Sequence, residues 1–113
     1  MRSDDAVRLR HMIDAAETAQ QFMAGRERAA LDADRMLLFA VVRAIEVVGE
    51  AATKVTAHTR ATSPQIPWAA VVGMRNRLIH GYFNVDTELV WQTVNRELPA
   101  MLPTLRSLPA SAA

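Results

Sequence analysis

A chain of 113 residues has room for one hydrophobic core, so residues 1–113 are predicted to form a single domain. Half of its residues are hydrophobic and 22% are charged, which is the composition of an ordinary soluble globular protein. The net charge of +1 is too small to predict a nucleic-acid partner by itself, so any such role depends on local charge placement. The absence of cysteine excludes disulfides and thiol chemistry, and a reducing compartment is the default expectation.

No segment is apolar enough to predict a signal peptide or a membrane span. The first fifteen residues contain three aspartates and lack an unbroken apolar run. The most apolar stretch, residues 36–48, is interrupted by Arg43 and Glu46 and is too short to cross a bilayer. We therefore expect a cytoplasmic protein with no membrane partner.

Helical periodicity predicts four to five amphipathic helices joined by short loops, and hence an all-α, up-and-down bundle. The first helix is expected over residues 3–25, opened by Ser3-Asp4-Asp5 and stopped by a glycine. A connection follows over residues 25–33. Asp32 or Asp34 is then expected to cap a second helix that runs to about His58.

The second predicted helix carries a core stripe and a narrower polar stripe. The core stripe alternates steps of four and three residues, at Leu37, Val41, Ala44, Val48, Ala51 and Val55. On the polar stripe, Arg43, Glu46 and Glu50 fit either a solvated face with intrahelical charge pairs or a polar seam facing another helix or subunit. Gly49 slightly favours the seam, because a mid-helix glycine suggests close approach of another backbone.

A third helix is expected to start at Pro67 and to end at Gly81, which supplies the C-terminal stop. Asn84 and Asp86 provide the following turn and the cap of a last helix over residues 86–107.

Two prolines interrupt this last predicted helix. Pro99 and Pro103 each remove a backbone hydrogen-bond donor, so a kink or a break is expected near residue 98. Residues 108–113 are expected to form a frayed tail.

The residues with the clearest chemical potential lie within residues 75–82, RNRLIHGY, at the end of the third predicted helix. Arg75 falls on the apolar stripe of that helix, so it needs a carboxylate partner. Glu46 and Glu50 on the neighbouring helix are the candidates. One interpretation is purely structural: the ion pair fixes how the two helices pack.

The other interpretation is catalytic. His80 lies in the last turn, where the helix dipole favours the imidazolium form, a candidate general acid. Arg75 and His80 are roughly 140° apart on an ideal helix. They can converge on one ligand only if the helix ends before His80 or if two copies of the segment face each other. Tyr82 adds a phenol that can donate a hydrogen bond or stack.

Arginine, histidine and amide together suit an anionic phosphorus centre, as in RNA cleavage. Arg75 would neutralise the phosphorane-like charge, and Arg77 could add a phosphate contact. His80 would take the 2′-hydroxyl proton or protonate the departing 5′-oxygen. Neither step needs a metal, the sequence has no metal-ligand spacing, and no cofactor is expected.

Arg75, His80 and Tyr82 fit an R-x4-H-x-Y pattern, which resembles the signature of HepT-like toxins in the HEPN superfamily. The resemblance extends over about residues 8–105, through RLRHM at 8–12, IEVVGEAA at 45–52, IPW at 66–68, GMRN at 73–76, VW at 90–91 and LP at 98–99. It implies an HEPN-like fold and a homodimer in which the motifs of two subunits line one cleft.

The resemblance also implies an activity: the toxin of a type VII toxin–antitoxin system, a metal-independent endoribonuclease that leaves 2′,3′-cyclic phosphate ends. Arg75 and His80 match the family's catalytic pair, and Asn76 matches the polar residue that often follows the arginine. RNA, not DNA, is the implied substrate. The implied antitoxin is an MntA-like nucleotidyltransferase that can AMPylate the motif tyrosine, here Tyr82. A bulky negative AMP group there would repel RNA phosphate.

Two alternatives use the same residues. The chain could be a non-catalytic helical dimer that binds a nucleotidyltransferase, with Arg75 as a structural ion pair. It could also bind a nucleotide at residues 75–82 without cleaving RNA. Loss of RNA cleavage in both Arg75→Ala and His80→Ala, with the fold retained, would separate the toxin from both alternatives.

Overall fold

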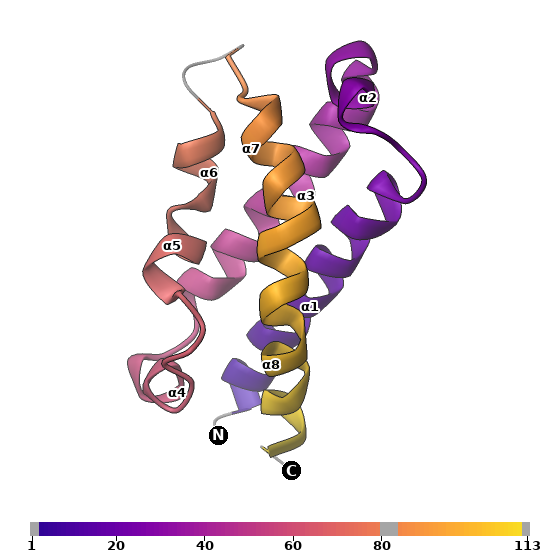
Figure 1. Cartoon of the computed structure of the whole chain (residues 1–113). Helices are drawn as coiled ribbons and strands as arrows, with labels where there is room; N and C mark the ends of the chain where they lie inside the picture. The colour runs from indigo at the N-terminus through magenta and orange to yellow at the C-terminus, as the bar shows by residue number, and fades with distance from the viewer. Residues whose placement is uncertain (1–2, 80–83, 112–113) are drawn as a thin grey trace.

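The computed structural model describes residues 3–79 and 84–111, which form a bundle of helices that alternate in direction (Figure 1). Its columns are α1 (Ser3–Met23), α3 (Arg35–Thr53), the pair α5 (Trp68–Val72) and α6 (Met74–Leu78), and α7 (Thr87–Gln92) continued by α8 (Leu98–Ser111). Two short helices, α2 (Arg28–Ala33) and α4 (Ala57–Ala61), lie at opposite ends of the bundle. The predicted all-α, up-and-down bundle is confirmed.

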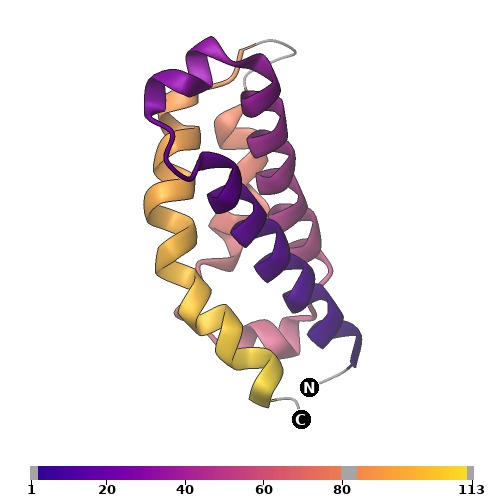
Figure 2. The same cartoon turned by 90° about the vertical axis from the view of Figure 1, so that its right-hand side faces the viewer.

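The core is built from the predicted apolar stripes. All six positions of the predicted stripe are buried: Leu37, Val41, Ala44, Val48 and Ala51 on α3, and Val55 just past its end. They meet buried side chains of α1, such as Leu9 and Ile13, and of the last column, such as Leu98 and Leu102. α1 lies along α3 on one side and along α8 on the other (Figure 2). None of the helices in the described part of the chain has the length and apolarity to cross a lipid bilayer.

Gly49 lies at a close approach of the α5 backbone to α3. A Cβ atom at this position would lie 3.1 Å from the carbonyl oxygen of Val71 and 3.6 Å from that of Val72. The predicted close approach of another backbone to this glycine is therefore confirmed. The absence of a side chain at Gly49 lets α5 pack closely against α3.

Gly49→Val is expected to lower the free energy of unfolding by about 2 kcal/mol, because the new side chain would push against the backbone of α5. Thr53→Val places the same side chain one turn later at an exposed position of α3 and serves as the matched control. Urea unfolding followed by circular dichroism measures both. Equal midpoints for the two variants would mean that α5 can move away without cost.

Two predicted boundaries around α3 are wrong. The second helix ends at Thr53 rather than near His58, because the chain turns and Thr56 starts a separate helix, α4, by accepting from the backbone N–H of Thr59. The predicted connection over residues 25–33 contains α2, which buries Leu31 against the core. The predicted stop at the preceding glycine is confirmed, since Gly25 has a φ of 72°.

The third predicted helix is also divided. Gly73, with φ −84° and ψ 2°, separates α5 from α6, and α6 ends at Leu78 rather than at Gly81. The buried residues of α6, Met74 and Leu78, continue from the buried Val71 of α5 in steps of three and four.

The last column does not break near residue 98. It passes through a π-helical turn, Thr93–Glu97, directly before Leu98. Pro99 has no N–H for the carbonyl one turn earlier, and a wider turn accommodates that loss. Leu108 is buried and α8 continues to Ser111, so the fraying of residues 108–113 stays a prediction.

Of the two candidate caps, Asp32 and Asp34, it is Asp34 that caps α3. Its Oδ1 accepts a hydrogen bond from the backbone N–H of Leu37 at 3.1 Å. That bond, with the hydrogen bond from Arg26 at 3.2 Å to Oδ2, holds the pKa of the Asp34 carboxyl below its usual value of 3.8. Asp86 caps α7 in the same way, through the N–H of Leu89.

The Asp34 cap makes stability depend on pH in a predictable direction. Because its folded pKa is depressed, the charged carboxylate stabilises the fold above pH 3.8, and this contribution is lost as the pH falls through the lower folded pKa. The difference in Tm between wild type and Asp34→Ala is therefore expected to be constant near neutral pH and to shrink below pH 3.8. Thermal melts at a series of pH values test this, and a difference that grows in acid would contradict it.

Candidate active site

Arg75 lies on α6 with its guanidinium directed at α3. Its Nε donates to Oε2 of Glu46 at 2.8 Å, and its Nη1 lies 3.5 Å from Oδ1 of Asn76. Of the two candidate partners, Glu46 and Glu50, the structure pairs Arg75 with Glu46. The predicted burial is wrong: the Arg75 side chain is 55% exposed, because the buried stripe of α5 and α6 runs through Val71, Met74 and Leu78 and Arg75 lies beside it.

This geometry leaves Arg75 able to contact a ligand. A guanidinium has five N–H donors in a planar fork, and these two contacts use only two of them. Glu46 is much less exposed than Arg75, at 21%, so the carboxylate forms a fixed support beneath the guanidinium. The arrangement suits an anion that approaches from solvent.

The other predicted supporting residues lie elsewhere. Glu50 accepts from Nη1 of Arg43 at 3.0 Å and is not the partner of Arg75. Nη1 of Arg77 reaches Oε1 of Glu97 in the π-helical turn, at 3.4 Å. Residues two apart point to nearly opposite sides of a helix, so Arg75 and Arg77 serve different faces of α6.

The ends of the segment over residues 80–84 are held together. Ile79 is extended, with φ −119° and ψ 121°, and forms an antiparallel bridge with Val85. The N–H of Asp86 donates to the carbonyl oxygen of Leu78 at 2.8 Å. The α6 helix therefore ends before His80, and the separation of 140° expected from a continuous helix does not apply. His80 and Tyr82 themselves lie outside the described residues.

A brace that sequence reasoning missed joins α2 to the first turn of α7. The hydroxyl of Thr87 donates to Oδ1 of Asp32 at 2.7 Å, and Nε of Arg28 lies 3.3 Å from Oε2 of Glu88. Arg28 also pairs with Asp32, one turn along α2. The i, i+4 spacing of Arg28 and Asp32 was the available signal that these residues form a helix. The brace anchors the chain just beyond the motif segment.

The fold and this site define a class of protein: a small helical bundle that presents an arginine, supported by a carboxylate, ahead of a histidine and a tyrosine. Residues 12–108 match the family described as Ribonuclease HepT-like, and the chain belongs to that family.

Curated relatives carry related names. The chain is 40% identical over 68 residues to "Probable ribonuclease HepT" of Thermococcus cleftensis, covering 60% of this chain and 62% of that protein. It is 41% identical over 66 residues to a candidate RNase of Methanocaldococcus jannaschii, covering 58% and 61%. A third similarity, at 31% over 101 residues, covers 89% of this chain but 46% of an M. jannaschii protein that also bears a gamma-glutamylcyclotransferase name.

These matches cover about three fifths of the length of the first two relatives. No solved structure gives a significant match to the chain.

Proposed function

We propose that the chain is the RNA-cleaving toxin of a type VII toxin–antitoxin system. Membership of the HepT-like ribonuclease family supports the activity. The observation that carries the proposal at the level of residues is the exposed guanidinium of Arg75, which Glu46 supports at 2.8 Å and which precedes the motif histidine, His80, by five positions in sequence.

The proposed reaction is an intramolecular transfer within RNA. The 2′-oxygen attacks the adjacent phosphorus, the bond to the 5′-oxygen breaks, and the products carry a 2′,3′-cyclic phosphate and a 5′-hydroxyl. Arg75 stabilises the charge that develops on the phosphoryl oxygens. His80 removes the 2′-hydroxyl proton or protonates the departing 5′-oxygen. Asn76, which already contacts Arg75, helps to hold the same phosphate.

Two partners complete the proposal. A second copy of the chain lines the other side of the RNA cleft, and a nucleotidyltransferase acts as the antitoxin. Transfer of AMP to Tyr82 would place a negative group beside the cleft, where it excludes RNA phosphate by occupancy and repulsion.

Cleavage of RNA by the purified chain in the presence of a chelator tests the activity. The expected products are 2′,3′-cyclic phosphate ends, mapped by their resistance to ligation until the cyclic phosphate is opened and the resulting phosphate is removed. Cleavage only with added metal, or ends with a free 3′-hydroxyl, would contradict the mechanism.

Mass spectrometry of the chain co-expressed with its adjacent nucleotidyltransferase tests the modification. An unmodified Tyr82 in the presence of a functioning antitoxin would contradict the proposed AMPylation of Tyr82.

The alternative of a non-catalytic module draws on the same ion pair, because Arg75 does join two helices. However, an ion pair with a guanidinium 55% exposed to solvent contributes little to stability, typically about 0–1 kcal/mol. A purely structural role would therefore give Arg75 only a small contribution to the stability of the fold. If His80→Ala left every RNA and growth effect unchanged, the non-catalytic alternative would replace the toxin.

A further inference from the structure

An exposed aromatic ring lies on the same side of α3 as Glu46. Phe39 precedes Glu46 by seven residues, so the two side chains are about two turns apart along the helix and roughly 20° apart around it. Phe39 is 58% exposed, whereas most large apolar residues of α3 are buried. The ring therefore adds little to the hydrophobic core and is available to a ligand at this side of the helix.

A guanidinium lies over this ring. Cζ of Arg35, one turn earlier on α3, is 5.5 Å from the centroid of the Phe39 ring. The carboxylate that precedes it in the chain, Asp34, is already engaged by the N–H of Leu37 and by Arg26. An aromatic ring beside an arginine is the combination that holds single-stranded nucleic acid, because bases stack on the ring while the cation attracts the phosphates.

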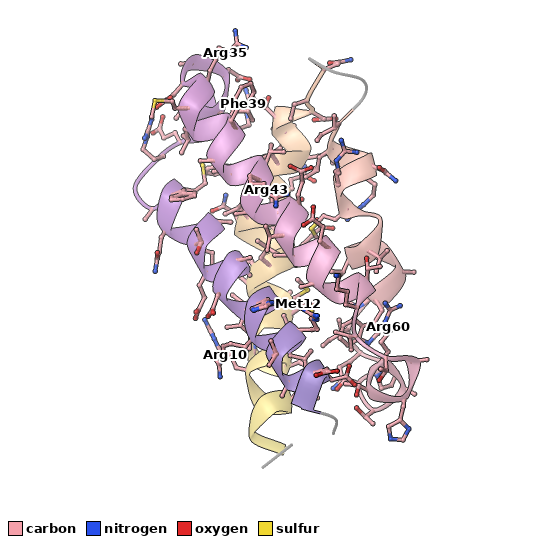
Figure 3. The ribbon with its side chains drawn as sticks, turned by 180° about the vertical axis from the view of Figure 1, so that it is seen from behind. Arg10, Met12, Arg35, Phe39, Arg43 and Arg60 are labelled. Carbon is pink, nitrogen blue, oxygen red and sulfur yellow. The ribbon has the colours of Figure 1, made fainter. Side chains whose placement is uncertain are left out.

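The ring and the candidate active site lie at the same end of the bundle. α3 begins at the end of the bundle where α6 finishes, and the two helices contact each other (Figure 1). Figure 3 shows Arg35 and Phe39 at the beginning of α3, with Arg43 farther along the same helix. Glu46 holds Nε of Arg75 at 2.8 Å. The ring is therefore roughly 10 Å along α3 from the side chain that supports the proposed phosphate contact.

We propose that Phe39 is a stacking platform for one base of the RNA substrate and that Arg35 attracts the strand beside it. The proposal rests on the proposed function, because it places the cleaved phosphate at Arg75. Stacked nucleotides follow each other at about 3.4 Å along a strand, so roughly 10 Å corresponds to about three nucleotides, and to fewer in an extended strand. The stacked base therefore lies within about three nucleotides of the cut.

This contact also identifies the class of RNA that is cut. A base can stack on a protein ring only when it is free of its neighbours in a duplex, as in loops, bulges and single strands. Stacking accepts every base, since each has a π-face, so the ring selects an unpaired base and not a particular sequence. The substrate is therefore RNA that is single-stranded beside the cut.

Paired removal of the ring and of single bases tests the platform. A short single-stranded RNA is made as a series in which each position in turn carries an abasic nucleotide. On the intact RNA, Phe39→Ala is expected to lower kcat/KM at least about fivefold, because one base loses its stacking partner. On the RNA that lacks the stacked base, the same substitution is expected to cause no further loss. That position is expected within about three nucleotides of the mapped cut.

Phe22→Ala is the matched control. It removes the same side chain from an exposed position of α1, at 42%, and is expected to leave cleavage of every RNA in the series unchanged. Phe39→Trp keeps an aromatic ring and is expected to retain the cleavage rate of the wild type. Thermal melts of the three variants that match wild type would show that each is folded.

Two results would overturn the platform and leave the proposed function standing. One is equal cleavage by wild type and Phe39→Ala. The other is an equal loss in Phe39→Ala on every RNA of the series, which with a lower mass in light scattering would assign the ring to a protein contact.

The same series with 2′-O-methyl riboses separates binding from cleavage, because its nucleophile is blocked. If wild type cleaves none of the unblocked RNAs but binds the blocked ones with the same dependence on Phe39 and on one base, the proposed function falls and the platform stands. A chain that neither cleaves nor binds these RNAs would overturn both.

Discussion

Arg75→Ala is expected to lower the rate of RNA cleavage by about 10²–10³-fold while the protein remains folded. The reason is the exposed position of the guanidinium, whose Nε is fixed by Glu46 while other N–H donors face solvent. Removal of these donors takes away the charge that would balance the phosphoryl oxygens in the transition state. Initial rates on a single RNA substrate, with thermal melts of the same samples, measure both effects.

Arg77→Ala is the matched control for this prediction. It removes an identical side chain two residues away on the same short helix, where Arg77 pairs with Glu97. If Arg77 only adds a distant phosphate contact, its loss should raise KM by a few fold and leave kcat nearly unchanged. Equal losses in the two variants would indicate a general effect of positive charge and would contradict a specific role for Arg75.

Glu46→Gln tests whether the negative charge of Glu46, and not only its hydrogen bond to Arg75, is needed to position the guanidinium. The amide oxygen can still accept from Nε of Arg75, but the negative charge that holds the guanidinium is gone. We expect a smaller loss than in Arg75→Ala, seen mainly in kcat, because Glu46 positions Arg75 without touching the substrate.

Much of the fold followed from periodic or local signals. The core stripe of α3, the caps at Asp34 and Asp86, and the close approach at Gly49 each depend on residues within one or two helical turns. The exposure of Arg75 was not predicted, because the buried stripe runs through Val71, Met74 and Leu78 and not through Val72 and Arg75. The sequence also could not predict that Arg75 pairs with Glu46 rather than with Glu50. Both glutamates lie on one stripe of α3, and only the position of α6 along α3 distinguishes them.

The clearest failure of local reasoning is Asp5. By position it belongs to the first turn of α1, where a negative charge favours the helix N-terminus, and nothing more was expected of it. In the structure it is 1% exposed and binds α4 from 51 residues away. Its Oδ1 accepts from the N–H of Thr56 at 3.0 Å, and its Oδ2 accepts from the hydroxyls of Thr56 and Thr59. No periodicity encodes a contact of this range.

Asp5→Ala is therefore expected to cause a large loss of stability, about 3 kcal/mol, because a backbone N–H and two hydroxyl groups lose their acceptor in a buried site. Each such group left without a partner costs about 1–3 kcal/mol, and partial entry of water lowers the sum. Asp4→Ala removes the same side chain from the preceding, exposed position and should shift the unfolding midpoint only slightly.

Asp5→Asn distinguishes hydrogen bonding from space filling. It keeps the volume and one acceptor but replaces the other oxygen with a donor, so the two threonine hydroxyls must turn to accept. Its stability should fall between those of wild type and Asp5→Ala in urea unfolding. If Asp5→Ala unfolded at the same midpoint as Asp4→Ala, the link between α1 and α4 would contribute nothing. The start of α1 would then be held by its apolar face alone.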